Sequence, residues 1–179
     1  MTDRNDIYIY NMDNAYTRRR FLGALSAGLA GATAGCLGSG SGSGNGKVES
    51  LPSPVMGNPD SDILVEVYED FACPHCRTYV LNVLPRLKSD YIDPGVIRYE
   101  HEDFPIPVDE KWSWEVPVAA RAVQDTVGDS AFWDFAKKAY ENQNNYSRDL
   151  LAQMGSDVGA DPEAVRKAVR NMTYRPVVE

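Results

Sequence analysis

Residues Ile63–Cys76 have the sequence ILVEVYEDFACPHC, in which an apolar stretch precedes two cysteines spaced two residues apart. The apolar stretch, Ile63–Tyr68, predicts a β-strand, and its near-continuous apolar character predicts burial on both faces. Residues 74–90 predict a helix that Pro85 kinks, because leucine and valine side chains recur there about one helical turn apart. The two cysteines therefore lie at a predicted strand-to-helix turn.

This turn suits the chemistry of a reactive thiol. Unpaired backbone N–H groups and the positive end of the helix dipole stabilise an anion at a helix N-terminus, so we expect Cys73 to be exposed and reactive as a thiolate. Pro74 lacks an N–H group and suits the first helical position. His75 can be cationic or donate a hydrogen bond toward the Cys73 sulfur, and Cys76 is expected to be the buried resolving thiol. A stabilised thiolate favours the reduced pair, which makes the disulfide an oxidant.

A cysteine pair at this spacing has two other interpretations. It can be half of a zinc site, although structural zinc usually has four nitrogen or sulfur ligands, and the chain offers only Cys36, His75 and His101 besides the pair. It can also be an inert pair of buried thiols. We expect the redox interpretation, with no metal and no cofactor. Glu69 and Asp70 precede the pair, and either a proton relay or a place as exposed acids of the turn remains open for them.

Several segments resemble one family. Glu69–Cys76 resembles the active-site segment of the DsbA-type thiol–disulfide oxidoreductases, a branch of the thioredoxin superfamily, and Pro-His between the cysteines is the dipeptide of its strongly oxidising members. His101–Pro105 is similar to the end of the family's next strand. Val118–Ala122 and Phe132–Phe135 resemble the opening helices of its inserted helical domain. The resemblance covers residues 63–170.

The resemblance implies an α/β, thioredoxin-like fold with an inserted helical domain at about 112–171. Members of the family continue beyond that insert with a loop that holds a cis-proline, two antiparallel strands and a final helix. Here only nine residues follow Arg170, so we expect a truncated fold in which these C-terminal strands and the final helix are missing. The strand Ile63–Tyr68 would then keep an open edge with unpaired backbone groups.

The other elements follow from turn residues and apolar spacing. Three prolines argue against a regular element over Leu51–Asp60, and residues 96–102 predict a second strand, parallel to the first. Asp129 or Ser130 is expected to cap one of the later helices. We predict helices over 116–127, 131–142, 146–158 and 161–171. Six aromatic side chains are expected to form the core of the helical insert: Trp112, Trp114, Phe132, Trp133, Phe135 and Tyr140.

The first 35 residues resemble an export signal rather than part of a fold. Arg18 and Arg19 belong to a stretch that resembles a twin-arginine export motif, and the weakly apolar run that follows is too short and too rich in glycine to span a membrane. Small residues before Cys36 resemble a lipoprotein cleavage box, so we expect Cys36 to be lipidated. The alternative is that Cys36 is only a small apolar residue at the end of the signal.

These segments predict how the chain is organised. Residues 1–35 are expected to be the signal, 36–60 the lipidated cysteine with a flexible tether rich in glycine, serine and proline, and 61–179 the partial DsbA-like domain. The protein would then be exported and tethered to the outer face of the cytoplasmic membrane, where disulfides persist.

The composition is acidic, with 26 acidic against 18 basic residues and a formal net charge of −8. This balance disfavours a nucleic-acid partner. Arginine also outnumbers lysine by twelve to six, and together with the acidity this suggests a salt-adapted organism.

The function expected from the sequence is that of a thiol–disulfide oxidoreductase which donates disulfides to exported proteins. Cys73 would form the mixed disulfide and Cys76 would resolve it. Its partners would be reduced exported proteins and a membrane or soluble redox partner that reoxidises the pair. Two alternatives remain: a disulfide reductase or isomerase with the same cysteines, and an inactive fragment or binding module.

Overall fold

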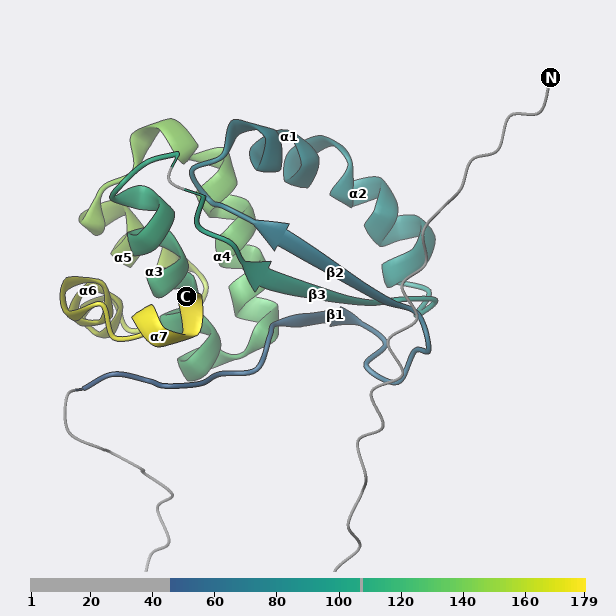
Figure 1. Ribbon diagram of the computed structural model, residues 1–179, viewed down its shortest axis with the longest axis horizontal. Helices are drawn as coiled ribbons and strands as arrows, with labels where there is room; N and C mark the ends of the chain where they lie inside the picture. Colours follow the sequence, from purple (N-terminus) through teal and green to yellow (C-terminus); the bar gives the residue numbers. More distant parts are fainter. Residues whose placement is uncertain (1–45, 107) are drawn as a thin grey trace, which may run out of the picture. The chain divides into compact units, whose positions relative to one another are not determined.

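The computed structural model describes residues 46–106 and 108–179 (Figure 1). The chain divides into two units, Met1–Ser39 and Gly40–Glu179, and the described residues all belong to the second. The expected export signal, with Arg18 and Arg19, and the expected lipidation site at Cys36 lie outside the described residues. No helix among the described residues is both long and apolar enough to cross a membrane.

A three-stranded sheet carries the site. Its strands are β1 (Val55–Gly57), β2 (Leu64–Glu69) and β3 (Arg98–Asp103), in the order β1-β3-β2 (Figure 1). β2 is parallel to β3, and β1 is antiparallel to it. The two predicted strands and their parallel pairing are therefore confirmed.

The prediction that Leu51–Asp60 has no regular element is wrong, because β1 lies inside it. β1 also lies within residues 36–60, over which a tether is expected. Pro52 and Pro54 precede β1, so all three of its paired residues keep the N–H group that a ladder needs. The prolines delimit the strand instead of preventing it.

The prediction that the first strand is buried on both faces is also wrong. Alternate residues of a strand point to opposite faces, and only the face of Val65 and Val67 packs against the cluster of Ile92, Ile97 and Tyr99. On the other face Tyr68 is 59% exposed. β2 is an edge strand of the described sheet, paired only with β3, which agrees with the expected open edge.

Helices α1 (Pro74–Asn82) and α2 (Leu84–Leu87) follow β2, and a π-helical turn, η1 (Lys88–Ile92), completes the segment. The predicted helix is thus confirmed as helical but broken next to Pro85. A turn with Gly95 in the left-handed region (φ 75°) then leads into β3.

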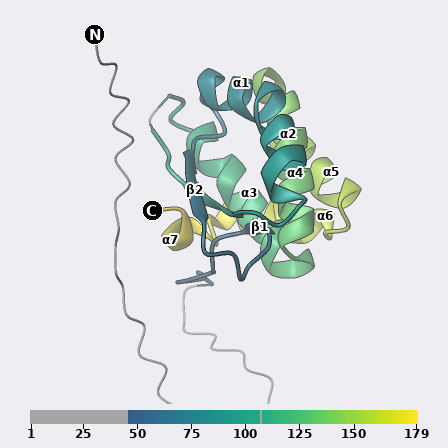
Figure 2. The same cartoon turned by 90° about the vertical axis from the view of Figure 1, so that its right-hand side faces the viewer.

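The rest of the chain is helical. Its elements are α3 (Trp112–Val127), α4 (Asp129–Glu141), a short 3-10 turn η2 (Gln143–Asn145), α5 (Arg148–Asp157), α6 (Pro162–Asn171) and α7 (Arg175–Val178). Four of these match the predicted helices, while α3 begins earlier and α7 was not predicted. Figure 2 shows α2 and α4 on the same side of the sheet.

Gly128, and not Asp129 or Ser130, is the N-cap of α4. The Asp129 carboxylate accepts hydrogen bonds from the Val55 backbone N–H and from Gln124 instead. The predicted cap is therefore wrong, because this side chain joins α4 to β1 and α3.

The predicted aromatic core is confirmed. Phe132, Phe135 and Tyr140 are fully buried, and the three tryptophans pack partly buried against the same cluster. This core fixes the helical part against the end of the sheet that carries the cysteines.

Candidate active site

The cysteine turn has the local structure that its sequence predicts. Cys73 is the N-cap of α1 with an extended backbone, and Pro74 begins the helix. The Cys73 N–H donates to the Asp70 carbonyl at 3.0 Å, and the Arg77 N–H donates to the Cys73 carbonyl at 3.1 Å. The N–H and the carbonyl of Cys73 are thus both hydrogen-bonded, and they fix its backbone at the N-terminus of α1.

The exposure of the two thiols differs from the prediction. Cys73 is 7% exposed and counts as buried, whereas Cys76 is partly exposed. The expected exposed Cys73 and buried Cys76 are therefore wrong. A segment around η2 lies against this turn: Gln143 and Tyr146 both donate hydrogen bonds to its backbone carbonyls.

The structure brings the two cysteines together as unbonded thiols. The pKa of Cys76 is raised to about 11, chiefly by burial. The neighbouring Cys73 side chain and the charge of Glu69 also raise it, while a backbone hydrogen bond at Asp70 lowers it. Cys76 consequently holds its proton at neutral pH. The two cysteines lie three residues apart at the start of α1, so they share one turn of this helix.

His75 is exposed on the first turn of α1. The predicted hydrogen bond from its ring toward the Cys73 sulfur is absent from the described contacts. A role for His75 in the chemistry of the pair stays a prediction.

Two carboxylates lie beneath the turn. Glu69 is 4% exposed and Asp70 is also buried, so the interpretation of these residues as exposed acids is wrong. Burial raises the pKa of Asp70, while its hydrogen bond from the Ala72 N–H at 2.7 Å opposes that rise. Both residues stand at the end of β2, where the strand enters the protein core.

Glu69 is one end of a buried charged network. The Glu69 Oε2 atom lies 3.4 Å from His101 Nδ1, His101 Nε2 lies 3.1 Å from Asp103 Oδ1, and Arg121 Nε lies 2.6 Å from Asp103 Oδ2. The side chains of all four are at most 4% exposed. The network crosses from β2 through β3 to α3, and so links the cysteine turn to the helical part.

Charges in this network shift the pKa values of its members. Burial acts to lower the pKa of His101, but hydrogen bonds and charges of Asp103 and Glu69 outweigh it, and the pKa is raised. Burial acts to raise the pKa of Asp103, but His101 and Arg121 outweigh it, and the pKa is lowered. The buried site therefore favours a protonated histidine between two carboxylates.

Sequence reasoning missed the network, Gln143 and Tyr146. Arg121 lies in an otherwise apolar part of its helix, and this isolated charge was the one available signal. Gln143 gives no such signal, because it lies 70 residues away from Cys73 in a polar segment.

A second acidic group lies on the sheet. Carboxylate oxygens of Glu66, Glu100 and Glu102 come within 4.8 Å of one another and could hold a metal ion. Glu66 and Glu100 are paired positions of the parallel strands. Glu100 and Glu102 already have partners, in Arg98 and Ser53.

A family model described as Thioredoxin matches residues 49–179. The chain belongs to the thioredoxin family. The solved structure of BdbD from Bacillus subtilis in its oxidised form matches this thioredoxin-family chain with a TM-score of 0.65, at 24% identity, over 75% of this chain and 76% of that one. The thiol–disulfide exchange protein α-DsbA2 from Wolbachia pipientis matches with a TM-score of 0.56, at 23% identity, over 66% of this chain and 60% of that one. The thioredoxin-like α/β fold and the DsbA-type resemblance are confirmed.

Among curated relatives, Disulfide bond formation protein D of Bacillus subtilis is 27% identical over 145 residues, which are 75% of this chain and 64% of that protein. The chain spans about half the length of the curated relatives it matches, with shares of 44%, 44% and 64% for the first three.

Proposed function

We propose that this thioredoxin-family chain is a thiol–disulfide oxidoreductase that donates disulfides to exported proteins. The observation that carries the proposal is the placement of Cys73 at the N-cap of α1, one helical turn before Cys76, with both cysteines as free thiols. The names of the relatives, among them a disulfide bond formation protein, support the same chemistry.

The proposed reaction begins with the Cys73–Cys76 disulfide. A substrate thiolate attacks the Cys73 sulfur, a mixed disulfide forms, and Cys76 leaves and takes up a proton. A second substrate thiolate then attacks the substrate sulfur of the mixed disulfide, and Cys73 leaves as a thiolate. Two electrons pass from the substrate dithiol to the cysteine pair, while one of the two substrate protons goes to Cys76 and the other to solvent. A membrane or soluble redox partner would reoxidise the pair.

The site divides these roles between the two sulfurs. Cys73 lies at the positive end of the helix dipole, where a leaving thiolate is stabilised. Cys76, with a pKa of about 11, binds a proton as soon as the disulfide opens. The backbone hydrogen bonds of Cys73 keep its sulfur at the N-terminus of α1 throughout the reaction.

A trapping experiment tests the proposal. With the full chain, Cys73→Ser should abolish the oxidation of a reduced model protein. Cys76→Ser, mixed instead with a model protein that carries a disulfide, should accumulate a mixed disulfide, because the Cys73 thiolate attacks that disulfide and no second thiol releases the product. The pair of variants separates the attacked sulfur from the resolving one. Unchanged oxidation by Cys73→Ser would reject the assignment and leave a cysteine pair without a catalytic role.

The reduction potential of the pair decides the direction of the reaction. A value near about −120 mV is typical of a disulfide donor, whereas one near about −270 mV is typical of a reductase. The second value would replace disulfide donation by reduction or isomerisation with the same residues.

We also propose export and membrane attachment, on the sequence of the first 36 residues. Replacing Arg18 and Arg19 by lysine should leave the precursor in the cytosol, and Cys36→Ser should release the exported protein from the membrane fraction. A Cys36→Ser protein that stays membrane-bound would contradict the lipid anchor.

A further inference from the structure

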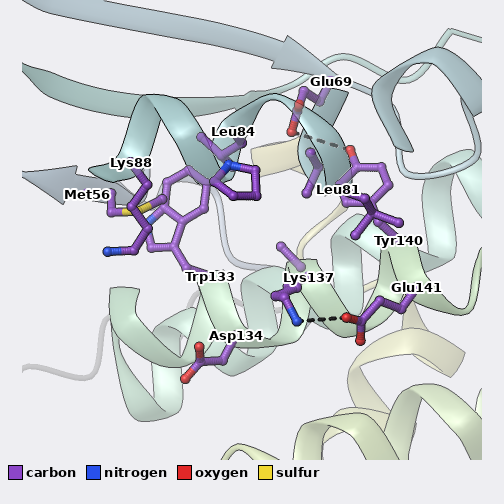
Figure 3. A pocket seen from close by; sticks show the side chains of 13 residues that line it. Met56, Glu69, Leu81, Leu84, Lys88, Trp133, Asp134, Lys137, Tyr140 and Glu141 are labelled. Carbon is purple, nitrogen blue, oxygen red and sulfur yellow. Dashed lines mark hydrogen bonds and ion pairs between the residues drawn. The ribbon is translucent and has the colours of Figure 1, made fainter. Parts of the chain in front are cut away.

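A cavity of about 510 Å³ lies between the α1–α2 segment and α4, apart from the cysteine turn. We call it the helix cavity. Its lining is mainly apolar, with Leu81, Leu84 and Trp133 among the residues shown in Figure 3. Small-molecule sites in proteins have this size and character, usually with a few polar groups that orient the ligand.

Glu69 supplies such a polar group. It lines the helix cavity from the end of β2 although it is 4% exposed. Figure 3 shows its carboxylate directed toward Tyr140, whose hydroxyl donates to Oε2 at 3.4 Å. The other oxygen, Oε1, is buried without a hydrogen-bond partner in the described structure. A buried carboxylate oxygen left in this way is costly, and a donor placed in the cavity would remove that cost.

We propose that the helix cavity binds a small aromatic molecule that carries one hydroxyl group, with the hydroxyl donating to Glu69 Oε1 and the rings against Trp133 and Leu84. The apolar lining accounts for the rings, and the unpaired oxygen accounts for the single donor.

The charges around the helix cavity favour a neutral donor over a cation. The Glu69 carboxylate already faces His101 at 3.4 Å, so its charge has a partner. At the rim Lys137 pairs with Glu141, and Lys88 pairs with Asp93. A hydroxyl satisfies Oε1 without adding charge to the cavity.

The lining also argues against a polypeptide segment as the occupant. Each residue of such a segment brings a backbone N–H and a C=O group that must be paired when buried. The apolar side chains that form most of the lining offer no partners for them, and at the rim Lys137 and Glu141 already pair with each other. A free aromatic molecule brings only the one polar group that the site can pair.

The test compares two probes that differ in one group. 2-Naphthol and 2-methylnaphthalene have the same rings, and only the first carries a donor. Titrated into the full chain and followed by the indole N–H signal of Trp133, 2-naphthol should bind saturably and at least about tenfold more tightly, because a hydrogen bond to a charged group is lost with the methyl compound. Equal affinities, or no saturable binding of 2-naphthol, would overturn the proposal. N-acetyltyrosinamide binding as tightly as 2-naphthol would also overturn it.

Variants place the probe in the cavity. Leu81→Trp puts a larger side chain into the lining and should weaken 2-naphthol binding by at least about tenfold. Val127→Trp, at an exposed position of α3 outside the cavity, is the matched control and should bind as the parent does. Glu69→Gln should reduce the preference for 2-naphthol over the methyl compound. A parent-like affinity in Leu81→Trp would show that the probe binds elsewhere.

Discussion

The side chain of Gln143 donates a hydrogen bond of 2.8 Å from Nε2 to the carbonyl oxygen of Cys73. The same nitrogen donates to the Phe71 carbonyl at 2.9 Å. One amide from η2 thus holds two backbone groups of the cysteine turn. The helical part of the chain therefore acts on the redox pair through a direct contact, in addition to packing.

Gln143→Leu should loosen the turn. Two carbonyls lose a donor, and we expect the free energy of unfolding to fall by about 1–3 kcal/mol and the alkylation of Cys73 to become faster. Denaturant unfolding and the rate of reaction with iodoacetamide measure the two effects. Asn144→Ala, at the exposed neighbouring position, is the control and should change neither. Equal alkylation rates in the two variants would show that Gln143 does not shield Cys73.

The buried pair of Arg121 and Asp103 should matter far more than an exposed pair. Both side chains are at most 3% exposed, so Arg121→Met would leave a buried carboxylate without the guanidinium that contacts it at 2.6 Å. We expect a loss of about 3–5 kcal/mol in the free energy of unfolding. Lys137→Met breaks an exposed pair with Glu141 and should cost less than about 1 kcal/mol. Similar losses in the two variants would mean that the network does not stabilise the fold.

Local chemistry explains what the sequence could predict. The N-cap position of Cys73, the proline at the start of α1 and the parallel pair of strands all follow from residues close together in the chain. The hydrogen bonds that Gln143 and Tyr146 donate to this turn do not, because both residues come from a distant polar segment. Local patterns carry no information on which distant side chain covers a turn.

The same limit explains the errors at Glu69 and in β1. A carboxylate next to a turn is usually exposed, and only the tertiary contact with His101 and Tyr140 makes burial of Glu69 tolerable. β1 is a three-residue strand whose pairing with β3 exists only in the folded chain. Its residues lack the alternation that identifies longer strands.

The charged network predicts how stability depends on pH. The pKa of His101 is raised by Asp103 and Glu69 in the folded state, so protonated His101 stabilises the fold fully below its unfolded pKa, about 6.5. This contribution is lost as the pH rises through the folded pKa. The melting temperature should therefore fall from pH 6 toward pH 9, and His101→Gln should flatten that slope.

His75 provides the matched control, because it is the other histidine of the chain and is exposed. His75→Gln should keep the slope of the parent. If the melting temperature still fell with pH in His101→Gln but no longer did so in His75→Gln, the pH dependence would not come from His101.

The contact between the two cysteines predicts a change in the pKa of Cys76. Burial is the largest cause of its value of about 11, and the hydrogen bond and charge of Cys73 add to it. Cys73→Ala removes the hydrogen bond and the charge of Cys73 but leaves the burial of Cys76. The pKa of Cys76 should then fall, yet stay above the ordinary value of 9.0. The pH dependence of alkylation at Cys76, followed by mass spectrometry, measures it.

His75→Ala is the control and should leave the pKa of Cys76 unchanged, since His75 is not one of the groups that shift this pKa. If Cys73→Ala also left it unchanged, the two sulfurs would not be in electrostatic contact, and a disulfide between them would require the turn to rearrange.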